Sequence, residues 1–411
     1  MKKVELLAPA GDLTRLKFAL AYGADAVYIG GKTLSMRAKA KNFSREEMAE
    51  AVRFTHERGK KLYVAANVCA HNADFAEPGH SFAIDEYLLF LQNIGVDAVL
   101  ISDVGVFSRA KIVAPELDIH VSTQANVTNF AAAEFWRDMG AKRVVLAREL
   151  SLREIAEIRE RTDIEIEVFA HGAMCMAYSG RCLISNFLTE RDASRGECSQ
   201  PCRYEYDLIE RRSGIKFPVS QNERGTFIFN SKDLCMAEHL ADLISAGVNC
   251  LKIEGRMKTE YYVGAVTKVY REAIDDFFAS PEIYAEKIPH YRAELEKVGN
   301  RGYTSGFFFG PPGASDHDYT GKLQHTSQNF LAVVESYDEK TGLARIEQRN
   351  KFSVGDKIEI VRSNGENFSQ IVTHMYDADT QISSAPHPMQ KIHLRVERSV
   401  AELDMIRRPA F

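Results

Sequence analysis

A short apolar segment, a polar turn and a helix-like stretch recur in that order through the first 254 of the chain's 411 residues. The apolar segments are rich in β-branched residues and have the length of strands; there are eight, at 4–7, 26–29, 62–67, 98–102, 119–122, 144–147, 165–170 and 250–254. Because most are apolar on both faces and are separated by helical patterns, they predict a parallel sheet covered by helices. Eight units fit a closed (β/α)8 barrel, whose chemistry lies after the carboxyl ends of the strands.

The ends of the predicted helices support this fold. The pairs Ser44–Glu47 and Ser151–Glu154 each fit a capping box at a helix start. Glycine ends four helical stretches just before a strand, at Gly23, Gly95, Gly140 and Gly247. An open, doubly wound sheet is the alternative, but its dinucleotide-binding form needs G-x-G-x-x-G after the first strand. Residues 8–12 read Ala-Pro-Ala-Gly-Asp instead, so the barrel is favoured.

Two regions depart from the repeat. Residues 171–230 form a long insertion between the seventh and eighth strands, with clustered cysteines and a hairpin-like pair at 204–210 and 226–230; such insertions are usually functional. Beyond a Pro-Pro-Gly break at 311–313, alternating runs separated by turns predict a small antiparallel β-barrel, with strands at 331–335, 342–347, 357–361, 371–375 and 392–396. We therefore predict a barrel domain over 1–310 and a second domain over 325–411.

Charge and hydropathy restrict the partners. Fifty-two basic and 57 acidic residues give a net charge of -5, so a nucleic-acid partner needs a local basic patch. The stretch 32–41 carries four positive charges and is one candidate, helped by Arg349, Lys351 and residues 407–408; a solvated surface is the alternative. No apolar run approaches the roughly 18 residues of a membrane span. The start shows no signal-peptide pattern, so we expect a cytoplasmic protein.

Four of the seven cysteines are clustered, in the pattern Cys175-x6-Cys182-x15-Cys198-x3-Cys202. Thiolates at this density can hold Zn²⁺ or an iron-sulfur cluster. Zinc sites usually have two closely spaced cysteine pairs, and only the second pair here is close, so the spacing favours a cluster. Buried free thiols are the alternative.

Polar residues stand where the predicted strands end, and a barrel would direct them towards one mouth. They are Asn67, Asp103, Gln124, Asn126, Arg148, Glu149, His171, Lys252, Glu254 and Arg256. Arg148 and Arg256 are candidates to clamp a carboxylate or phosphate, and Glu254 is a candidate proton acceptor. Any one of them is equally well explained as a polar loop residue. As a set they predict a site, with Glu254, Arg256, Arg148, His171 and Gln124 as its candidate catalytic residues.

Residues 167–185, which include His-Gly-Ala-Met-Cys at 171–175, resemble the signature of the collagenase-like peptidase family. The likeness continues through 196–203, 230–235, 252–256 and 301–304. Within that family the chain is most similar to the branch that hydroxylates tRNA. The resemblance implies oxygen-independent, prephenate-dependent formation of 5-hydroxyuridine at the wobble position, with a [4Fe-4S] cluster as cofactor and the tRNA anticodon loop as partner. Related members act on a ribosomal RNA cytidine or a ubiquinone precursor.

The resemblance also implies a ligand set. In the quinone branch the cluster cysteines match Cys175, Cys182, Cys198 and Cys235, which makes Cys235 the expected fourth ligand. Cys202 is the alternative because it is adjacent in sequence to Cys198. A flipped uridine in the cavity would stack on an aromatic residue such as Tyr28 or Tyr178.

Two other functions compete with the hydroxylase. A peptidase needs a nucleophile, a base and an orienting group, and no local phrase supplies them; the H-E-x-x-H motif of zinc proteases is also absent. His171 and Cys175 could form a Cys/His pair, but the thiolate is better explained as a cluster ligand. A non-enzymatic iron-sulfur or zinc scaffold is the third hypothesis.

Overall fold

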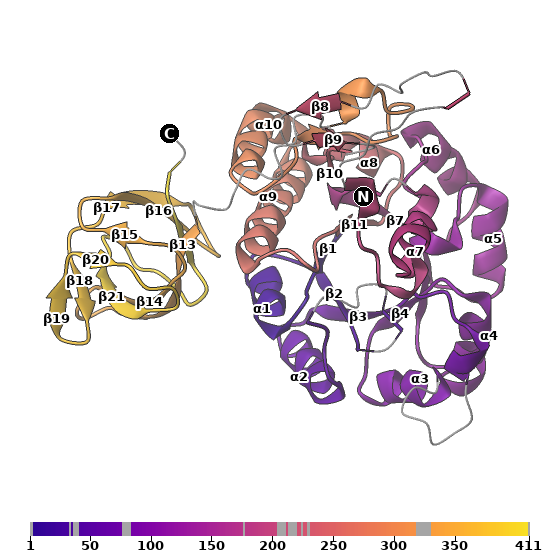
Figure 1. The fold of residues 1–411 in the computed structure, drawn as a ribbon. Helices are drawn as coiled ribbons and strands as arrows, with labels where there is room; N and C mark the ends of the chain where they lie inside the picture. The colour runs from indigo at the N-terminus through magenta and orange to yellow at the C-terminus, as the bar shows by residue number, and fades with distance from the viewer. Residues whose placement is uncertain are drawn as a thin grey trace.

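Eight parallel strands form a closed ring at the centre of the larger domain (Figure 1). The computed structural model describes residues 3–32, 34–35, 41–75, 84–175, 177–203, 211–212, 220–222, 225–227, 231–317 and 330–409. The ring consists of β1 (Glu5–Pro9), β2 (Ala26–Gly30), β3 (Lys61–Ala66), β4 (Ala98–Ile101), β5 (Ile119–Val121), β6 (Arg143–Val145), β7 (Glu165–Ala173) and β11 (Cys250–Ile253). Neighbours pair in sequence order, and β11 closes the ring by pairing with both β7 and β1. The predicted (β/α)8 barrel is confirmed.

Helices surround the ring, as the sequence pattern predicts (Figure 1). They are α1 (Leu13–Ala21), α2 (Arg45–His56), α3 (Ile84–Asn93), α4 (Val104–Val113), α5 (Phe130–Asp138), α6 (Leu152–Arg161), α8 (Leu240–Ser245), α9 (Glu260–Ala279) and α10 (Pro281–Glu296). Both predicted capping boxes are present, at Ser44 and Ser151. The four glycines predicted to end helices all have positive φ. No helix in these ranges is long and apolar enough to cross a membrane.

The insertion after β7 contains short elements. They are the helix α7 (Ile184–Thr189), the 3₁₀ turns η3 (Tyr178–Gly180), η4 (Ala193–Arg195) and η5 (Pro201–Arg203), and the strands β8 (Ser220–Asn222), β9 (Gly225–Phe227) and β10 (Asp233–Cys235). β8 pairs with β9, whereas β10 runs antiparallel to β7 and parallel to β12 (Tyr303–Thr304). The predicted strand 204–210 lies outside the described residues, as does most of the basic stretch 32–41. Further 3₁₀ turns are η1 (Asn72–Phe75), η2 (Thr123–Ala125), η6 (Ala237–His239) and η7 (Ala314–Asp316).

The C-terminal domain is an antiparallel half-barrel with its own apolar core. Its strands are β13 (Phe330–Asp338), β14 (Leu343–Gln348), β15 (Phe352–Ser353), β16 (Lys357–Val361), β17 (Phe368–Ile371), β18 (Met375–Asp377), β19 (Thr380–Ile382), β20 (Ser384–Ala385), β21 (Lys391–Arg395) and β22 (Met405–Arg407). Four of the five predicted strands are confirmed. The predicted strand 371–375 is wrong: β17 ends at Ile371 and β18 begins at Met375, because the apolar run continues across the connection between them.

The half-barrel contacts the helices on one side of the larger domain. The hydroxyl of Tyr22, at the end of α1, is shared between the carbonyl oxygens of Val361 (2.8 Å) and Leu403 (3.0 Å). Arg407 of β22 pairs with Glu294 of α10 at 2.7 Å and is almost fully buried. These contacts lie beside α1, α9 and α10 and leave the barrel mouth clear (Figure 1).

Candidate functional site

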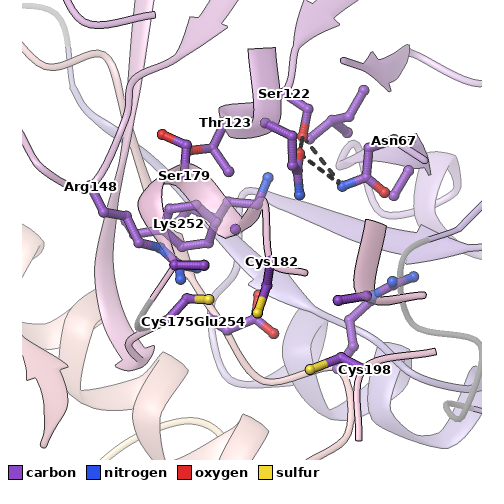
Figure 2. Close-up of a pocket in the computed structure, with 18 of the residues that line it drawn as sticks. Asn67, Ser122, Thr123, Arg148, Cys175, Ser179, Cys182, Cys198, Lys252 and Glu254 are labelled. Atoms are coloured by element: carbon purple, nitrogen blue, oxygen red, sulfur yellow. Dashed lines mark hydrogen bonds between the residues drawn. The ribbon is translucent and has the colours of Figure 1, made fainter. Parts of the chain in front are cut away.

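A cavity opens at the carboxyl ends of the barrel strands, where the sequence predicts the chemistry of the fold (Figure 2). It includes about 1020 Å³ of space between protein atoms, part of it open to solvent. Side chains at and after the carboxyl ends of the barrel strands form its walls, and the cysteine-rich segment after β7 forms its rim. Four of the five predicted catalytic residues line this cavity: Gln124, Arg148, Glu254 and Arg256.

Glu254 and Arg256 lie on a turn after β11 that is packed against glycines. A Cβ atom at Gly30 would lie 1.7 Å from Arg256 Nη1, and one at Gly11 would lie 2.2 Å from the Arg256 carbonyl oxygen. Gly172 has a φ of +108°, and a Cβ there would lie 2.4 Å from the Glu254 carbonyl oxygen. A larger residue at Gly11 or Gly172 would displace the backbone of the turn, and one at Gly30 would displace the Arg256 guanidinium. These glycines therefore help to fix the position of both functional residues.

The two residues of this turn have different surroundings. The Tyr28 hydroxyl is shared between the Ile253 carbonyl oxygen (3.0 Å) and Glu254 Oε2 (3.3 Å), so an aromatic ring and a carboxylate meet at one edge of the cavity. Arg256 is almost fully buried, and its Nη2 donates to Ser35 Oγ at 2.9 Å. Glu254 can therefore exchange a proton with a ligand, whereas Arg256 lies deeper in the wall.

Charged residues fill the barrel below the cavity, in what we call the floor: Glu5, Arg143, Glu167 and Lys252. Lys252 Nζ donates to Glu167 Oε1 at 2.8 Å, and Arg143 Nη1 donates to Glu167 Oε2 at 3.2 Å and Glu5 Oε1 at 2.7 Å. Burial alone would raise the pKa of the Glu167 carboxyl, but the Lys252 and Arg143 cations hold that pKa below its usual range. The Glu167 carboxylate is therefore ionised, and both its oxygens accept from cations of the same chain.

One wall of the cavity is cationic and aromatic. Lys252 Nζ lies 4.5 Å from the centre of the Tyr28 ring and 5.5 Å from that of the Phe169 ring. The Arg148 guanidinium carbon lies 3.8 Å from the centre of the same Phe169 ring. Arg148 Nη1 donates to the Ala173 carbonyl oxygen at 3.3 Å. Its Nε is buried and has no hydrogen-bond partner among the described residues. Two cations beside an aromatic face can bind an unsaturated carboxylate.

The other wall presents side-chain amides and hydroxyls. Asn67 follows β3, and Ser122 and Gln124 follow β5. Ser122 Oγ donates to Gln124 Oε1 at 2.7 Å, and Asn67 Nδ2 lies 3.3 Å from both Gln124 Oε1 and Ser122 Oγ (Figure 2). Neutral polar groups held in a fixed orientation can recognise a neutral ligand by hydrogen bonds.

Thiols gather at the rim, where Cys175, Cys182, Cys198 and Cys202 all line the cavity. Figure 2 shows the first three around the opening below Arg148 and Lys252. In the ranges that the structure describes, no three His, Cys, Asp or Glu side chains converge closely enough to hold a single metal ion. An iron-sulfur cluster does not require its ligands to converge on one ion, because each thiolate binds a different iron atom of the cluster. The residue type and the common cavity fit a cluster.

A short latch ties this rim to the barrel. The backbone N–H of Ser179 donates to Glu149 Oε1 at 2.7 Å. The Ser179 hydroxyl lies 2.9 Å from Asn126 Oδ1 and 3.2 Å from Glu149 Oε2. Asn126 has φ +62°, which asparagine tolerates, and Ser179 has φ +48°, a left-handed conformation that serine rarely adopts unless surrounding contacts hold it. These contacts of Ser179 with Glu149 and Asn126 form the latch. Ser179 lies between Cys175 and Cys182 in the sequence, so the latch restricts the positions of both cysteines.

His171 and Cys235 are not among the residues that line the cavity. The pairing of β7 with β11 is irregular between Lys252 and Ile253, and such a bulge turns the following side chain to a new direction. The His171 ring packs against three tyrosines, and burial lowers its pKa to about 3. Cys235 pairs with His171 across β10 and β7, and burial raises the pKa of its thiol to about 11.

Three functional residues were not singled out from the sequence: Phe169, Ser122 and Ser179. Phe169 alternates with Glu167 along β7, so strand periodicity could have placed it on the same face. Ser122 is the last residue of a predicted strand and could have been included with the other strand-end residues. No local signal marks Ser179, because its role depends on Glu149, thirty residues earlier in the chain.

Two profiles of the same protein family match this chain, one over each domain. The profile described as Peptidase family U32 matches residues 11–318, and the profile described as Peptidase family U32 C-terminal domain matches residues 326–407. These two matches cover the barrel domain and the half-barrel.

Three relatives cover most of the chain. It is 40% identical over 408 residues to "tRNA hydroxylation protein P1" of Bacillus subtilis (strain 168), which covers 99% of this chain and 95% of that protein. It is 37% identical over 420 residues to "tRNA hydroxylation protein P" of Escherichia coli (strain K12), which covers 92% and 90%. It is 34% identical over 404 residues to the "23S rRNA 5-hydroxycytidine C2501 synthase" of the same organism, which covers 95% of this chain and 59% of that protein.

Proposed function

The chain belongs to peptidase family U32, and from this premise we propose that it is a tRNA-modifying enzyme. The reaction is the oxygen-independent hydroxylation of the wobble uridine to 5-hydroxyuridine, with prephenate as co-substrate and a [4Fe-4S] cluster as cofactor. Relatives about 40% identical over nearly the full length carry names that denote tRNA hydroxylation. The observation that carries the proposal is one cavity that combines thiols at its rim, cations on one wall and amides on the other.

The cluster is proposed to be held by Cys175, Cys182 and Cys198 together with a fourth thiol. When bound, it would supply iron atoms that can take up or release single electrons. The resemblance to the quinone branch points to Cys235 as the fourth ligand. Cys202 is the alternative, because it lines the cavity with the other three cysteines.

Arg148 and Lys252 are proposed to bind the carboxylates of the small acid. Arg148 Nε is a buried donor without a partner among the described residues, and a bound carboxylate would satisfy it. Lys252 is held over the Tyr28 ring by Glu167, which leaves further N–H groups of Nζ for a ligand. Glu254, at the same edge as the Tyr28 hydroxyl, is proposed to accept the proton lost during the reaction.

The decisive test is the nucleoside content of tRNA. A strain that lacks this chain should lose 5-hydroxyuridine-type nucleosides, and the wild-type chain should restore them. Arg148→Ala should restore them poorly, with a loss of tenfold or more, whereas Arg137→Ala on the surface of α5 should restore them fully. An unchanged nucleoside profile in the deletion strain would remove the proposed function.

Iron and sulfide analysis of anaerobically purified variants tests the ligands separately. Cys175→Ser, Cys182→Ser and Cys198→Ser should each lose the cluster. We expect Cys235→Ser to lose it and Cys202→Ser to keep it. The opposite result for this pair would make Cys202 the fourth ligand, and an iron-free wild-type protein would remove the cluster from the proposal.

The structure gives a peptidase little support beyond the family name. A Cys/His nucleophile pair needs the two side chains within hydrogen-bond distance. Cys175 lines the cavity, whereas His171 is buried among Tyr262, Tyr270 and Tyr303 and does not line it. If the purified protein cleaves peptides after all clustered cysteines are replaced, that conclusion must change.

A further inference from the structure

The two walls of the cavity differ in chemistry, and the wall with amides has an unused donor. Figure 2 shows Arg148 and Lys252 on one side of the opening and Asn67 and Ser122 on the other. A carboxylate has its partners on the cationic wall. The amide wall is neutral, and Gln124, the residue at its centre, is only 8% exposed.

The orientation of the Gln124 amide is fixed by its neighbours. Its Oε1 accepts the Ser122 hydroxyl at 2.7 Å and lies 3.3 Å from Asn67 Nδ2. Asn67 Nδ2 also lies 3.3 Å from Ser122 Oγ, which can accept that bond because its own proton goes to Gln124. A reversed Gln124 amide would bring its NH₂ group against the NH₂ group of Asn67. The network therefore keeps Oε1 on these two residues and directs Nε2 away from them.

Nε2 of Gln124 has no hydrogen-bond partner in the part of the chain that the structure describes. Gln124 lines the cavity and its Nε2 is not fully enclosed by protein atoms, so this donor can be reached from the cavity. A ligand in the cavity that presents an acceptor to this wall would satisfy it.

We propose that Gln124 Nε2 donates a hydrogen bond to the O4 carbonyl oxygen of the substrate pyrimidine and thereby selects uracil over cytosine. This rests on the proposed function, in which an RNA base enters the cavity. Uracil carries a carbonyl oxygen at position 4, where cytosine carries an amino group. A fixed N–H donor therefore meets an acceptor, O4, in uracil, and another donor, the amino group, in cytosine. A site built to hydrogen-bond one group rejects an analogue that leaves the partner unpaired. Ser122 and Asn67 act as positioning residues, because they set the direction of the amide.

Binding to matched RNA hairpins tests the proposal without requiring catalysis. Two anticodon stem-loops that differ only in U or C at the wobble position are titrated against the purified full-length chain, with fluorescence anisotropy as the readout. The wild type should bind the U hairpin about tenfold more tightly, the order expected for one good donor-acceptor match. Gln124→Glu has the same shape but replaces the N–H donor by an acceptor, so it should abolish or reverse the preference.

Two further variants define the effect. Ser122→Ala removes one group that fixes the amide, so the preference should fall to about threefold while the hairpins still bind. Gln381→Glu makes the same chemical change on the exposed strand β19 and should leave the tenfold preference unchanged. Equal U-to-C ratios for wild type and Gln124→Glu would overturn the proposal, and so would a wild type without preference.

The outcome is separable from that of the proposed function. If the preference for the U hairpin depends on Gln124 but no 5-hydroxyuridine forms in cells, the proposal of base selection is supported and the proposed hydroxylase function is rejected. If 5-hydroxyuridine forms and the preference is indifferent to Gln124, the chemistry stands and base selection by Gln124 fails.

Discussion

The floor of the cavity and its cysteine-rich rim carry their functional groups in opposite ways. In the floor, Glu167 is fully buried and both its oxygens are bonded to cations of the same chain. At the rim, residues 174–203, the thiols line an open cavity. Leu183, just before α7, is 79% exposed, and Phe187, within α7, is 87% exposed. Glu167 is satisfied without a ligand, whereas the rim is joined to the barrel domain by contacts such as the Ser179 latch and the Arg195–Asp74 pair.

This difference separates stability from function. A buried charge network must be satisfied within the chain, since removing one partner leaves the others charged and buried. A rim that is to accept a cofactor and a large substrate cannot be filled by its own side chains. We therefore expect changes in the floor to alter global unfolding and changes in the rim to alter local opening. The predictions below test that division.

The largest effect is expected from Glu167→Ala. The substitution leaves Lys252 and Arg143 buried next to each other without their shared carboxylate, which costs about 3–5 kcal/mol in comparable buried pairs. Urea unfolding followed by circular dichroism measures it. Glu157→Ala removes an exposed carboxylate of α6 and should cost about 0–1 kcal/mol. A loss for Glu167→Ala within that smaller range would show that the floor is not a stabilising unit.

A smaller, pH-dependent effect is expected at His171. Its folded-state pKa of about 3 lies below its ordinary value of about 6.5, so between these values the unfolded chain binds a proton that the folded chain does not. This contribution to stability is complete above pH 6.5 and is lost as the pH falls towards 3, by up to about 1.4 kcal/mol per pH unit. Unfolding free energies from pH 7 to pH 5 should fall less steeply for His171→Gln than for the wild type.

The control for this pH profile is His374→Gln, which changes an exposed histidine of the half-barrel and should keep the wild-type slope. An identical slope for His171→Gln and the wild type would mean that the ring is protonated in the folded protein. His171 would then be able to exchange a proton in the folded protein, in keeping with its prediction as a catalytic residue.

The fold was predictable because its signals are local and repeated. Each strand is marked by its own β-branched run, and each helix by its cap or its final glycine, so errors at one position leave the others intact. In the half-barrel the signal is weaker. β22 is three residues long and ends in Arg407, which is buried only because Glu294 and Glu359 pair with it.

The part of the site that could be predicted is the set of residues whose position is determined by the ends of the barrel strands. Gln124, Arg148 and Glu254 meet because parallel strands end at the same face of a barrel. His171 follows a predicted strand too, but in the structure β7 continues to Ala173. The irregular pairing beside His171 depends on how β7 and β11 meet, and nothing local in the sequence reveals it. The direction of the Gln124 amide likewise needs Asn67 from another strand.

The smallest effect should come from the latch. Ser179→Ala keeps the backbone bond to Glu149 but loses the hydroxyl contacts, which are worth about 1 kcal/mol. If the rim opens independently of the barrel, trypsin should cleave after Arg181 or Arg191 about fivefold faster while the urea midpoint stays unchanged. Ser179→Gly loses the same contacts but relieves the positive φ, so it should open the rim less than Ser179→Ala. A urea midpoint that falls together with faster cleavage would join rim and barrel into one cooperative unit and remove the distinction between them.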